Sequence, residues 1–469
     1  MKLWGGRFES GPAELFERYS GSLDFDRKLF EADVVGSKAF ANALCGVGIL
    51  TAAERDKINA AFDGMLSEAG EPGYFDADDE DIHTFVIRKL GEAVGELAEK
   101  IHTGRSRNEQ IATDFRLWMK AAIRRVQAQL ETLMNSLLRL AERESDALLP
   151  GYTHLRRAQA VLFAHYLLAY FEMFLRDWQR MQQAYEHTDV LPLGSGALAG
   201  SGFAFDRGAM AADLGFAAIS ANSMDAVSDR DFALDFLYAA SVAMLHASRL
   251  AEDWILYSSE EFGFLELGDE VTTGSSLMPQ KRNPDALELL RGKAGRVCGS
   301  LQSLMMTLKG LPLTYNRDLQ EDKEGVFDSA AQVTDSLAIL ALCVDSAQLK
   351  RPAMEQAADE GWVSATALAE VLARRGIAFH RAHQIVGGIV LAGVQQGKRP
   401  AEWSLEELRG FAPELDESVL AALVPRNALE NHKLPGGTAR DRVREALAAA
   451  KARLAGLART AEGEGSGAA

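Results

Sequence analysis

The run Asp285-Ala286-Leu287-Glu288-Leu289-Leu290-Arg291-Gly292-Lys293-Ala294 opens a segment whose apolar residues recur in alternating steps of three and four. The recurring positions are Leu287, Leu290, Ala294, Val297, Leu301, Leu304, Leu308 and Leu311. Alternating steps of this kind form the seam of a helix that packs along other helices, as in a coiled coil. The segment therefore predicts one long helix of a helical bundle.

Four other segments show the same helical periodicity, at about residues 111–140, 158–187, 231–258 and 324–344. The prolines between Pro72 and Pro352 stand at positions 150, 192, 279, 284 and 312. Each lies between two helical patterns, where a missing N–H does least harm. No sustained alternating pattern of a strand is found, so we expect an all-α fold.

The five long helices predict a central bundle over residues 106–352. Residues 1–105 predict a mostly helical N-terminal domain, and residues 353–469 a small helical C-terminal domain. Several of the long helices have wide apolar faces rich in Ala, Leu and Met. One bundle cannot cover faces of that length, so we expect the bundles to merge by self-association along the helix axes.

Composition excludes some classes of partner. The chain has 50 basic and 67 acidic residues and a formal charge of −17, which argues against nucleic acid or an anionic membrane as main partner. Its three cysteines, Cys45, Cys298 and Cys343, are typical of reduced core residues in a cytoplasmic protein. We find no apolar run of the length that a signal peptide or a membrane span needs.

Four polar clusters fall at the ends of the predicted helices. The first, Thr273–Asp285, contains Gly274, two serines, Lys281 and Asn283. Asn283-Pro284-Asp285 predicts a capped helix start. Backbone N–H groups, a hydroxyl and a lysine at a helix N-terminus are suited to holding a carboxylate. An ordinary polar loop before a capped helix explains the spacing about as well.

The other three clusters have similar chemistry. His102–Gln110 contains two arginines, Gly151–Gln159 contains His154, and Leu313–Lys323 offers Tyr315, Arg317, Gln320 and Lys323 to a charged ligand. His154 is flanked by donors in a loop, which makes it the best of the nine histidines for proton transfer. A charged helix start, a structural histidine and a solvated connector are the respective alternatives.

The sequence contains no motif that favours a metal site or a cofactor site. The chain has no Cys-x-x-Cys, no His-Glu-x-x-His and no Gly-x-Ser-x-Gly. Gly194–Ala199 fits a dinucleotide fingerprint in form, but no alternation of strands and helices surrounds it. We therefore expect neither a metal nor a cofactor.

The motif Gly274-Ser275-Ser276-x-Met278-Pro279-x-Lys281-x-Asn283-Pro284 resembles the signature of the fumarase/aspartase superfamily, whose members cleave C–N or C–O bonds and release fumarate. Four further stretches narrow the resemblance to the argininosuccinate lyases: Leu3–Phe8, His102–Gln110, Gly151–Gln159 and Tyr315–Lys323. The resemblance extends over nearly the whole chain, including Asn222–Asp225 and Gly436–Ala439, and the combination is far more specific than the first motif alone.

The resemblance implies elimination of L-arginine from argininosuccinate to give fumarate, the last step of arginine biosynthesis, without a cofactor. It also implies a cytoplasmic homotetramer whose active sites are each shared by three subunits. The alternatives are another fumarate-releasing lyase, acting on adenylosuccinate, aspartate or malate, and a non-catalytic crystallin-like structural protein.

The resemblance also assigns site residues. Ser275 matches the catalytic serine, His154 the catalytic histidine and Glu288 the acid that pairs with it. Which of Ser275 and His154 is the base stays open. Lys281 and Asn283 would hold the succinyl carboxylate. Substrate-binding positions are Ser22, Ser106, Arg107, Asn108, Thr153, Gln159, Tyr315, Gln320 and Lys323, and Arg317 joins them from its cluster.

The chain departs from the family pattern at several positions. Arg156 and Ala160 replace the usual Gln and Pro, Ser201-Gly202 replaces Asn-Pro, and Ala367 stands where Asp is common. None of these removes a predicted catalytic group. We expect these departures to affect the stiffness of the loops and the rate of the reaction more than the type of reaction.

Overall fold

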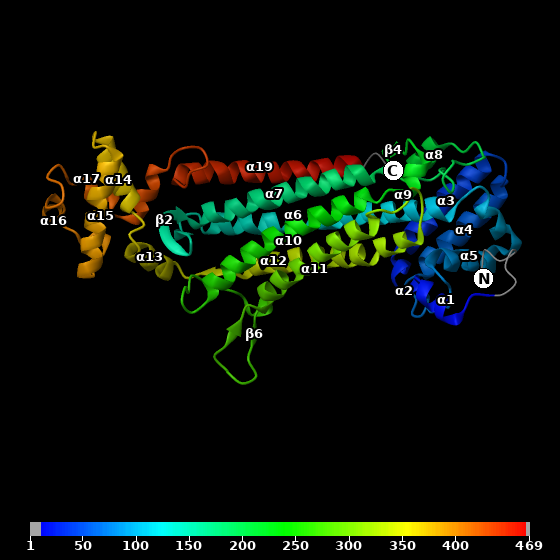
Figure 1. Cartoon of the computed structure of the whole chain (residues 1–469), viewed down its shortest axis with the longest axis horizontal. Helices are drawn as coiled ribbons and strands as arrows, with labels where there is room; N and C mark the ends of the chain where they lie inside the picture. Colours follow the sequence, from blue (N-terminus) through cyan, green and yellow to red (C-terminus); the bar gives the residue numbers. More distant parts are fainter. Residues whose placement is uncertain (1–10, 466–469) are drawn as a thin grey trace.

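The computed structural model describes residues 11–465 of the chain, so the predicted motif Leu3–Phe8 lies outside the described residues. The molecule is an elongated helical bundle with smaller helices at each end (Figure 1). The N-terminal helices lie at one end and helices α14 (Ala365–Arg374) to α17 (Ser418–Ala422) at the other. The all-α prediction is confirmed.

Five long helices form the centre of the bundle, in the order that the periodicity predicts. Helix α6 runs over 37 residues, which is about 55 Å at 1.5 Å per residue. It packs against α7 and α12, and α10 packs against α7, α11 and α12. The bounds are α6 (Arg107–Arg143), α7 (Phe163–Thr188), α10 (Asp231–Ser258), α11 (Asp285–Leu308) and α12 (Glu324–Ser346).

A sixth long helix completes the bundle and corrects the expected C-terminal domain. Helix α19 (Arg440–Gly465) lies along α6 and α7 instead of staying with residues 353–439 (Figure 1). Its Val443, Ala450 and Leu454 belong to the same apolar core as the long helices. The sequence pattern did not predict α19 as a helix of the bundle, because alanines fill most of the rest of its apolar face and weaken the stripe.

The N-terminal region packs small helices against the start of α6. Its helix α5 begins at a capping aspartate, Asp81, whose side chain accepts from the N–H of Thr84. The bounds are α1 (Glu14–Ser20), α2 (Leu23–Asp26), η1 (Arg27–Leu29), α3 (Phe30–Gly46), α4 (Ala52–Glu68), α5 (Ile82–Val94) and η2 (Gly95–His102).

The C-terminal end has an apolar core of its own, formed by residues between Leu368 and Leu423. This core supports a separate small domain, although the predicted boundaries at residues 105 and 352 stay predictions. The remaining bounds there are α13 (Arg351–Glu360), α15 (Phe379–Gln396), η5 (Pro400–Glu402), α16 (Leu405–Arg409), α18 (Pro425–Ala428) and η6 (Leu429–Asn431).

Short strands appear where the sequence predicts none. β1 (Leu148–Thr153) and β2 (Arg156–Leu162) form an antiparallel hairpin, so the helix expected from Ala158 begins only at Phe163. The hairpin escapes a pattern search because its strands are short and largely polar toward the turn. Smaller pairs are β3 (Val190–Leu191) with β4 (Ala218–Ile219), β5 (Leu265–Glu266) with β8 (Gln348–Leu349), and β6 (Thr273–Gly274) with β7 (Arg282–Asn283).

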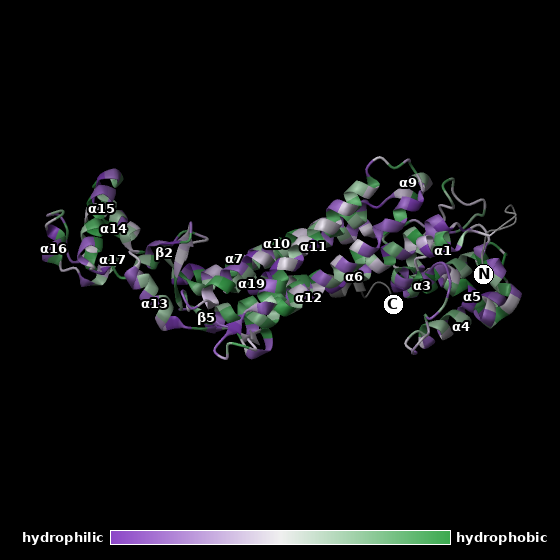
Figure 2. Ribbon diagram, turned by 60° about the horizontal axis from the view of Figure 1, so that its bottom comes forward, coloured by the Kyte–Doolittle hydropathy of each residue, from purple (hydrophilic) through white to green (hydrophobic). Residues whose placement is uncertain are grey.

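Packing in the bundle is dense and partly aromatic. Phe115 on α6 contacts Phe232 on α10 and Phe327 on α12, with ring centroids 5.4 and 6.1 Å away. Figure 2 shows hydrophobic residues along the central helices. The segment Arg317–Ser346 is long and apolar enough to cross a membrane, contrary to our expectation, but 56% of its apolar window is buried inside the protein. It therefore fits the core helix of a bundle.

Leu454→Ala should test the place of α19. Leu454 is 6% exposed in the bundle core, so its truncation should lower the free energy of unfolding by about 2–5 kcal/mol. Leu434→Ala is the matched control, because Leu434 is 80% exposed and its loss should cost less than about 0.5 kcal/mol. Urea unfolding at one protein concentration measures both. Equal effects would contradict the packing of α19.

Candidate active site

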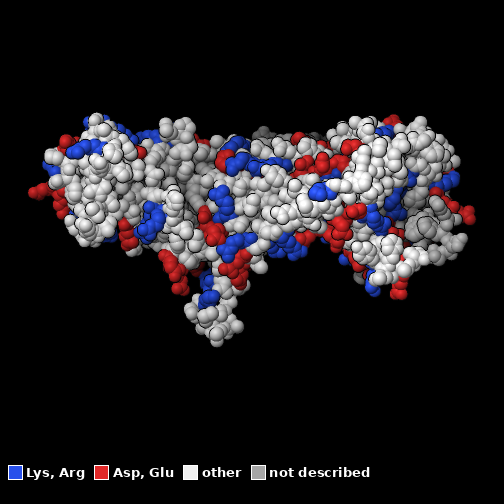
Figure 3. Space-filling view, in the orientation of Figure 1, with Lys and Arg blue, Asp and Glu red and all other residues white. Residues whose placement is uncertain are grey.

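The motif loop forms an arm that stands away from the bundle. Strands β6 and β7 pair at its base, and the arm projects from the body of the molecule (Figures 1 and 3). Directly after β6, the hydroxyl of Ser275 accepts from the backbone N–H groups of Leu277 and Met278, at 3.3 and 3.1 Å. These bonds hold Ser275 in a tight turn.

The base of the arm is fixed by polar contacts. The guanidinium of Arg282 donates to Glu266 Oε1 at 2.6 Å and to the carbonyl of Leu267 at 2.8 Å. Thr273 donates to the carboxylate of Asp285 in the first turn of α11. The expected cap is wrong: Asn283 lies in β7, and Pro284 takes the N-cap position without a side-chain bond. Strand pairing with Thr273 keeps Asn283 out of the helix end.

The reactive groups of the arm face solvent in a single chain. Lys281 and Glu288 are exposed, and Ser275 is partly exposed. Among the described residues, neither Lys281 nor Glu288 has a side-chain hydrogen bond or ion pair. The predicted pairing of Glu288 with His154 is therefore not made within one chain.

His154 lies at the tip of the β1–β2 hairpin. Its strands pair Tyr152 with Arg157 and Thr153 with Arg156, which leaves His154 and Leu155 as a two-residue turn. Both turn residues have positive φ, 54° and 55°, as a type I′ turn requires. The predicted site residues of this hairpin, Thr153, His154 and Gln159, are all exposed.

The start of α6 brings another group of predicted residues together. Ser106 caps the helix in a capping box with Glu109, and Asn108 donates to the carbonyl of Ala197 at 3.3 Å. Arg107 donates to both carboxylate oxygens of Asp81 at 2.7 Å. The glycine loop after α7 thus meets the cluster, since the N–H of Gly194 also donates to Glu109, at 2.6 Å.

The turn before α12 lies against the same end of the bundle. Arg317 and Gln320 both donate to the carbonyl of Ser20, at 2.8 and 3.2 Å. Ser22 follows two residues later, and its hydroxyl is already bound to Asp26 at 2.5 Å. Burial raises the pKa of Tyr315, so its hydroxyl stays a neutral donor. Lys323 is 5% exposed, and its ammonium is held by Asp322 at 2.6 Å.

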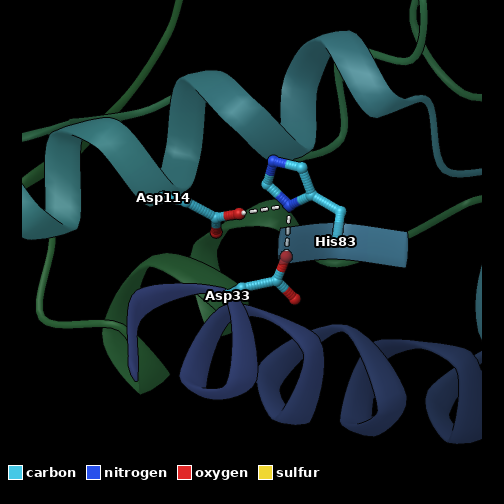
Figure 4. Close-up of side chains that lie close together, drawn as sticks. All are labelled: Asp33, His83 and Asp114. Atoms are coloured by element: carbon cyan, nitrogen blue, oxygen red, sulfur yellow. Dashed lines mark hydrogen bonds and ion pairs between the residues drawn. The ribbon is translucent and has the colours of Figure 1, made fainter. Parts of the chain in front are cut away.

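A buried network of charged side chains lies beside the Ser106 cluster at the start of α6. The sequence pattern did not predict this network. His83 Nδ1 bonds to Asp33 and lies 3.4 Å from Asp114 (Figure 4). Arg105 donates to Ser37, and Gln110 to Asp33, both at 3.0 Å. Asp33, His83 and Asp114 come from α3, α5 and α6, and Arg105 from the loop before α6, so no single stretch of sequence carries the signal.

Three ligand atoms converge in this network, yet its chemistry favours a proton over a metal ion. His83 Nδ1 and Asp33 already share a hydrogen bond, which leaves no room for an ion between them. The cationic Arg105 also lies against Asp33 and Asp114. Burial and the nearby Asp33 raise the pKa of Asp114 well above its ordinary value, which favours the protonated carboxyl group.

Asp81 links the network to Arg107. Burial by itself raises the pKa of Asp81, but His83, Arg107 and the N–H of Thr84 together lower it to about 2. The carboxylate is therefore charged at neutral pH and fixes the position of the Arg107 guanidinium.

The Ser106 cluster and the His154 hairpin do not meet within one chain. The Ser106 cluster lies at the N-terminal end of α6, and the His154 hairpin follows its C-terminal end. The 37 residues between them span about 55 Å. The Ser275 arm projects from the body between the two ends (Figure 1). A ligand the size of a small metabolite could not touch both the Ser106 cluster and the His154 hairpin of a single chain.

Comparisons with known proteins find matches over nearly the whole chain. The lyase family model matches residues 6–299, and the model described as argininosuccinate lyase C-terminal matches residues 362–430. The chain is 59% identical over 458 residues to an argininosuccinate lyase of Solibacter usitatus, covering 97% of this chain and all of that protein.

Solved structures share the fold. The structure of EDDS lyase in complex with formate has a TM-score of 0.87 at 24% identity, covering 98% of this chain and 93% of that one. A class II fumarase of Schistosoma mansoni has a TM-score of 0.74 at 17% identity, covering 91% and 94%. At this identity, both similarities support the architecture of the chain alone.

Acid should weaken the Asp81–Arg107 contact. A carboxylate whose pKa is lowered on folding contributes stability above its ordinary pKa of 3.8, and this contribution is lost as pH falls toward 2. Its loss amounts to roughly 2 kcal/mol. Asp81→Asn should therefore flatten the fall in unfolding free energy between about pH 4 and pH 2, measured by urea unfolding. Arg107→Gln, which keeps the carboxylate, should shift the fall to higher pH. Identical curves for all three proteins would contradict the contact.

Proposed function

Because this chain belongs to the argininosuccinate lyases of the fumarase/aspartase superfamily, we propose that its active sites are assembled from the Ser106 cluster, the His154 hairpin and the Ser275 arm of three different subunits. The reaction is the elimination of L-arginine from argininosuccinate, which releases fumarate. The observation that carries the proposal is the length of α6, which holds two of the three clusters about 55 Å apart.

The proposal needs an assembly, and the surface of the bundle supports a homotetramer. Large apolar side chains stay exposed on the outer faces of α10, α11 and α12. They include Tyr238, Leu245, Leu289, Met305, Met306 and Leu342, each 48–64% exposed. Contiguous exposed apolar surface on a soluble chain marks an interaction site. Merging these faces along the helix axes would bring the ends of one bundle beside the arm of another.

The arm supplies the groups that act on the succinyl part of the substrate. Removing a proton from the carbon beta to the leaving nitrogen moves charge onto the carboxylate attached to that carbon, and loss of the nitrogen then forms the double bond of fumarate. Lys281, Asn283 and the N–H groups of the arm are donors for that charge, and preorganised donors of this kind are often the largest contribution to catalysis. Ser275 would remove the proton, its pKa lowered in part by the ammonium of Lys281.

His154 would act on the leaving nitrogen, or exchange roles with Ser275. At the exposed tip of its hairpin it is free to enter a site on a neighbouring subunit. Glu288 is equally exposed on the first turns of α11. Contact between subunits would pair the two, and the carboxylate would orient the imidazole and stabilise its charged form.

The arginine end of the substrate would lie at the Ser106 cluster. Ser106, Asn108, Tyr315 and Gln320 are partly exposed there and offer hydroxyl and amide groups. Arg107 is partly exposed beside them, fixed by Asp81. Further members of the proposed set are Ser22, Thr153, Gln159, Arg317 and Lys323. Lys323 and Ser22 are buried and already bonded within the chain, so they would act by shaping the cluster unless the turn opens.

The alternative functions predict a different substrate or no reaction. A lyase for adenylosuccinate, aspartate or malate would release fumarate from that substrate instead, and a crystallin-like structural protein would release none. The 59% identity to an argininosuccinate lyase and the retention of Ser275, His154, Lys281 and Asn283 favour the first reading. A cytoplasmic enzyme of arginine biosynthesis is the cellular role that we propose for it.

Ser275→Ala should abolish most turnover while folding and assembly persist. Loss of a positioned proton acceptor should lower kcat about 10²- to 10⁴-fold, measured as fumarate absorbance with argininosuccinate as substrate. Gln280→Ala is the matched control, because Gln280 is exposed on the same arm at a variable position of the motif. A Ser275→Ala protein with near-native kcat would contradict the assignment, and absence of fumarate from the unmodified chain would contradict the reaction.

Mixed assemblies should test the sharing of sites. Ser275→Ala and His154→Asn chains, each inactive alone, would be dissociated, combined in equal amounts and reassembled. If Ser275 and His154 of one site come from different subunits, about a quarter of the sites receive both native residues and regain activity. Sites contained within one chain would give a mixture as inactive as its parents. Each variant reassembled alone is the control.

A further inference from the structure

The turn that carries His154 has a backbone conformation that its residues do not favour. His154 and Leu155 hold φ values of 54° and 55°, a region that Asn and Gly adopt far more readily. Backbone strain of this kind persists only where the surrounding structure over-determines it. The contacts of the two hairpin strands must therefore hold the turn in place.

One support of the hairpin is aromatic. The ring of Tyr152 lies 5.6 Å from Phe262 and 6.4 Å from Phe264, centroid to centroid. Tyr152 is paired across the hairpin with Arg157, the second residue beyond the turn. The aromatic group fixes the first strand, and the second strand needs a support of its own.

Arg157 gives that support through Gly361, at the end of α13. A Cβ atom placed on Gly361 would stand 2.6 Å from Arg157 Cδ and 3.2 Å from its Cβ, so the arginine stem lies directly on the glycine. The guanidinium is 3.7 Å from Glu360. Because both charged groups are more than a third exposed, this ion pair adds little. The close packing of the stem is the stronger contact.

The surroundings make this contact important for the hairpin. A cavity of 570 Å³ opens beside it, lined by residues that include Tyr152, Arg157, Phe264 and Gly361. The space next to the second strand is therefore not filled by other side chains. Without Arg157, the end of the second strand near the turn would lose its contact with Gly361, although β1 stays packed on α13 and β2 on α7, α18 and η6.

We propose that Arg157 is a positioning residue for the reaction: its stem, seated on Gly361, holds the strained hairpin turn in the orientation in which His154 meets the substrate. The contact between Arg157 and Gly361 joins the small C-terminal domain to the turn that carries His154. Gly361 is the residue before the region of that domain that the family model matches, 362–430. The inference rests on the proposed role of His154. Arg157 itself touches no substrate.

Gly361 offers a reciprocal test. Its φ of −94° suits any residue, so its missing Cβ is needed for space alone. The space is shared by Arg157 and, at 3.1 Å, by the carbonyl oxygen of Ala357. Gly361→Ala should displace the arginine stem in the native chain. In a chain that also carries Arg157→Ala, the clash at 2.6 Å with Cδ is removed, and only the Cβ of residue 157, at 3.2 Å, stays on that side.

The experiment measures kcat, KM and thermal unfolding of the full-length protein with argininosuccinate. Arg157→Ala should lower kcat about 10- to 100-fold, while KM stays within about twofold and the unfolding temperature stays native. Arg157→Lys, which keeps the stem, should restore most of kcat. Gly361→Ala should lower kcat in the native chain and have little further effect in the Arg157→Ala chain. Gly64→Ala, at a helical glycine with no atom within 4 Å of an added Cβ, is the control for the substitution.

The outcomes separate this inference from the function. A native kcat for Arg157→Ala, a kcat lost only together with thermal stability, or an equal effect of Gly361→Ala in both chains would overturn the positioning role. His154→Asn is measured in parallel. If it keeps native turnover, the proposed role of His154 fails, and the role of Arg157 fails with it. If it is inactive while Arg157→Ala is native, the positioning role alone fails.

Discussion

The unbroken hydrogen-bonded length of α6 is the constraint on which the rest of the structure depends. A helix of 37 residues without proline or glycine is a stiff rod. Its first turn is fixed by a capping box, and its last turn leads into the β1–β2 hairpin. The rod therefore sets the distance between the chain's Arg107 and its His154. No adjustment of loops can bring those two residues together in one subunit.

The start of α6 is fixed by more than its cap. The carboxylate of Glu109 is fully buried and accepts N–H groups from Ser106 and Gly194. Burial raises the pKa of Glu109, although these N–H groups oppose that effect. One side chain thus joins the helix start to the glycine loop. Together with the network around His83, it makes the Ser106 cluster rigid, whereas the arm and the hairpin project into solvent.

Much of the fold could be predicted from the sequence, because long helices carry their own periodic signal. Helices α10 and α12 begin where the pattern does, at Asp231 and Glu324. Features that depend on distant partners could not be predicted. The β1–β2 hairpin needs Phe262 and Gly361 from elsewhere in the chain, and α19 is recognised as a bundle helix only once it lies against α6 and α7.

In the active site too, local features could be predicted from the sequence, and features that depend on distant partners could not. The motif residues could be named one by one, because reactive residue types cluster at helix ends. The partners of these residues within the chain could not be predicted. Lys323 is hydrogen-bonded to Asp322, and Asn283 pairs in a strand instead of capping α11. The buried group of Asp33, His83 and Asp114 is assembled from three helices, so no stretch of sequence displays it.

The position of α19 has a consequence for how the chain is made. Helices α6 and α7 are synthesised well before α19, which covers one side of them. Since chains fold from the N-terminus as they emerge, the growing protein must carry an uncovered apolar face until α19 has been made. Val443, Ala450 and Leu454 close that face only after the small C-terminal helices have been synthesised. Docking of α19 therefore completes the core on which the association of folded subunits depends.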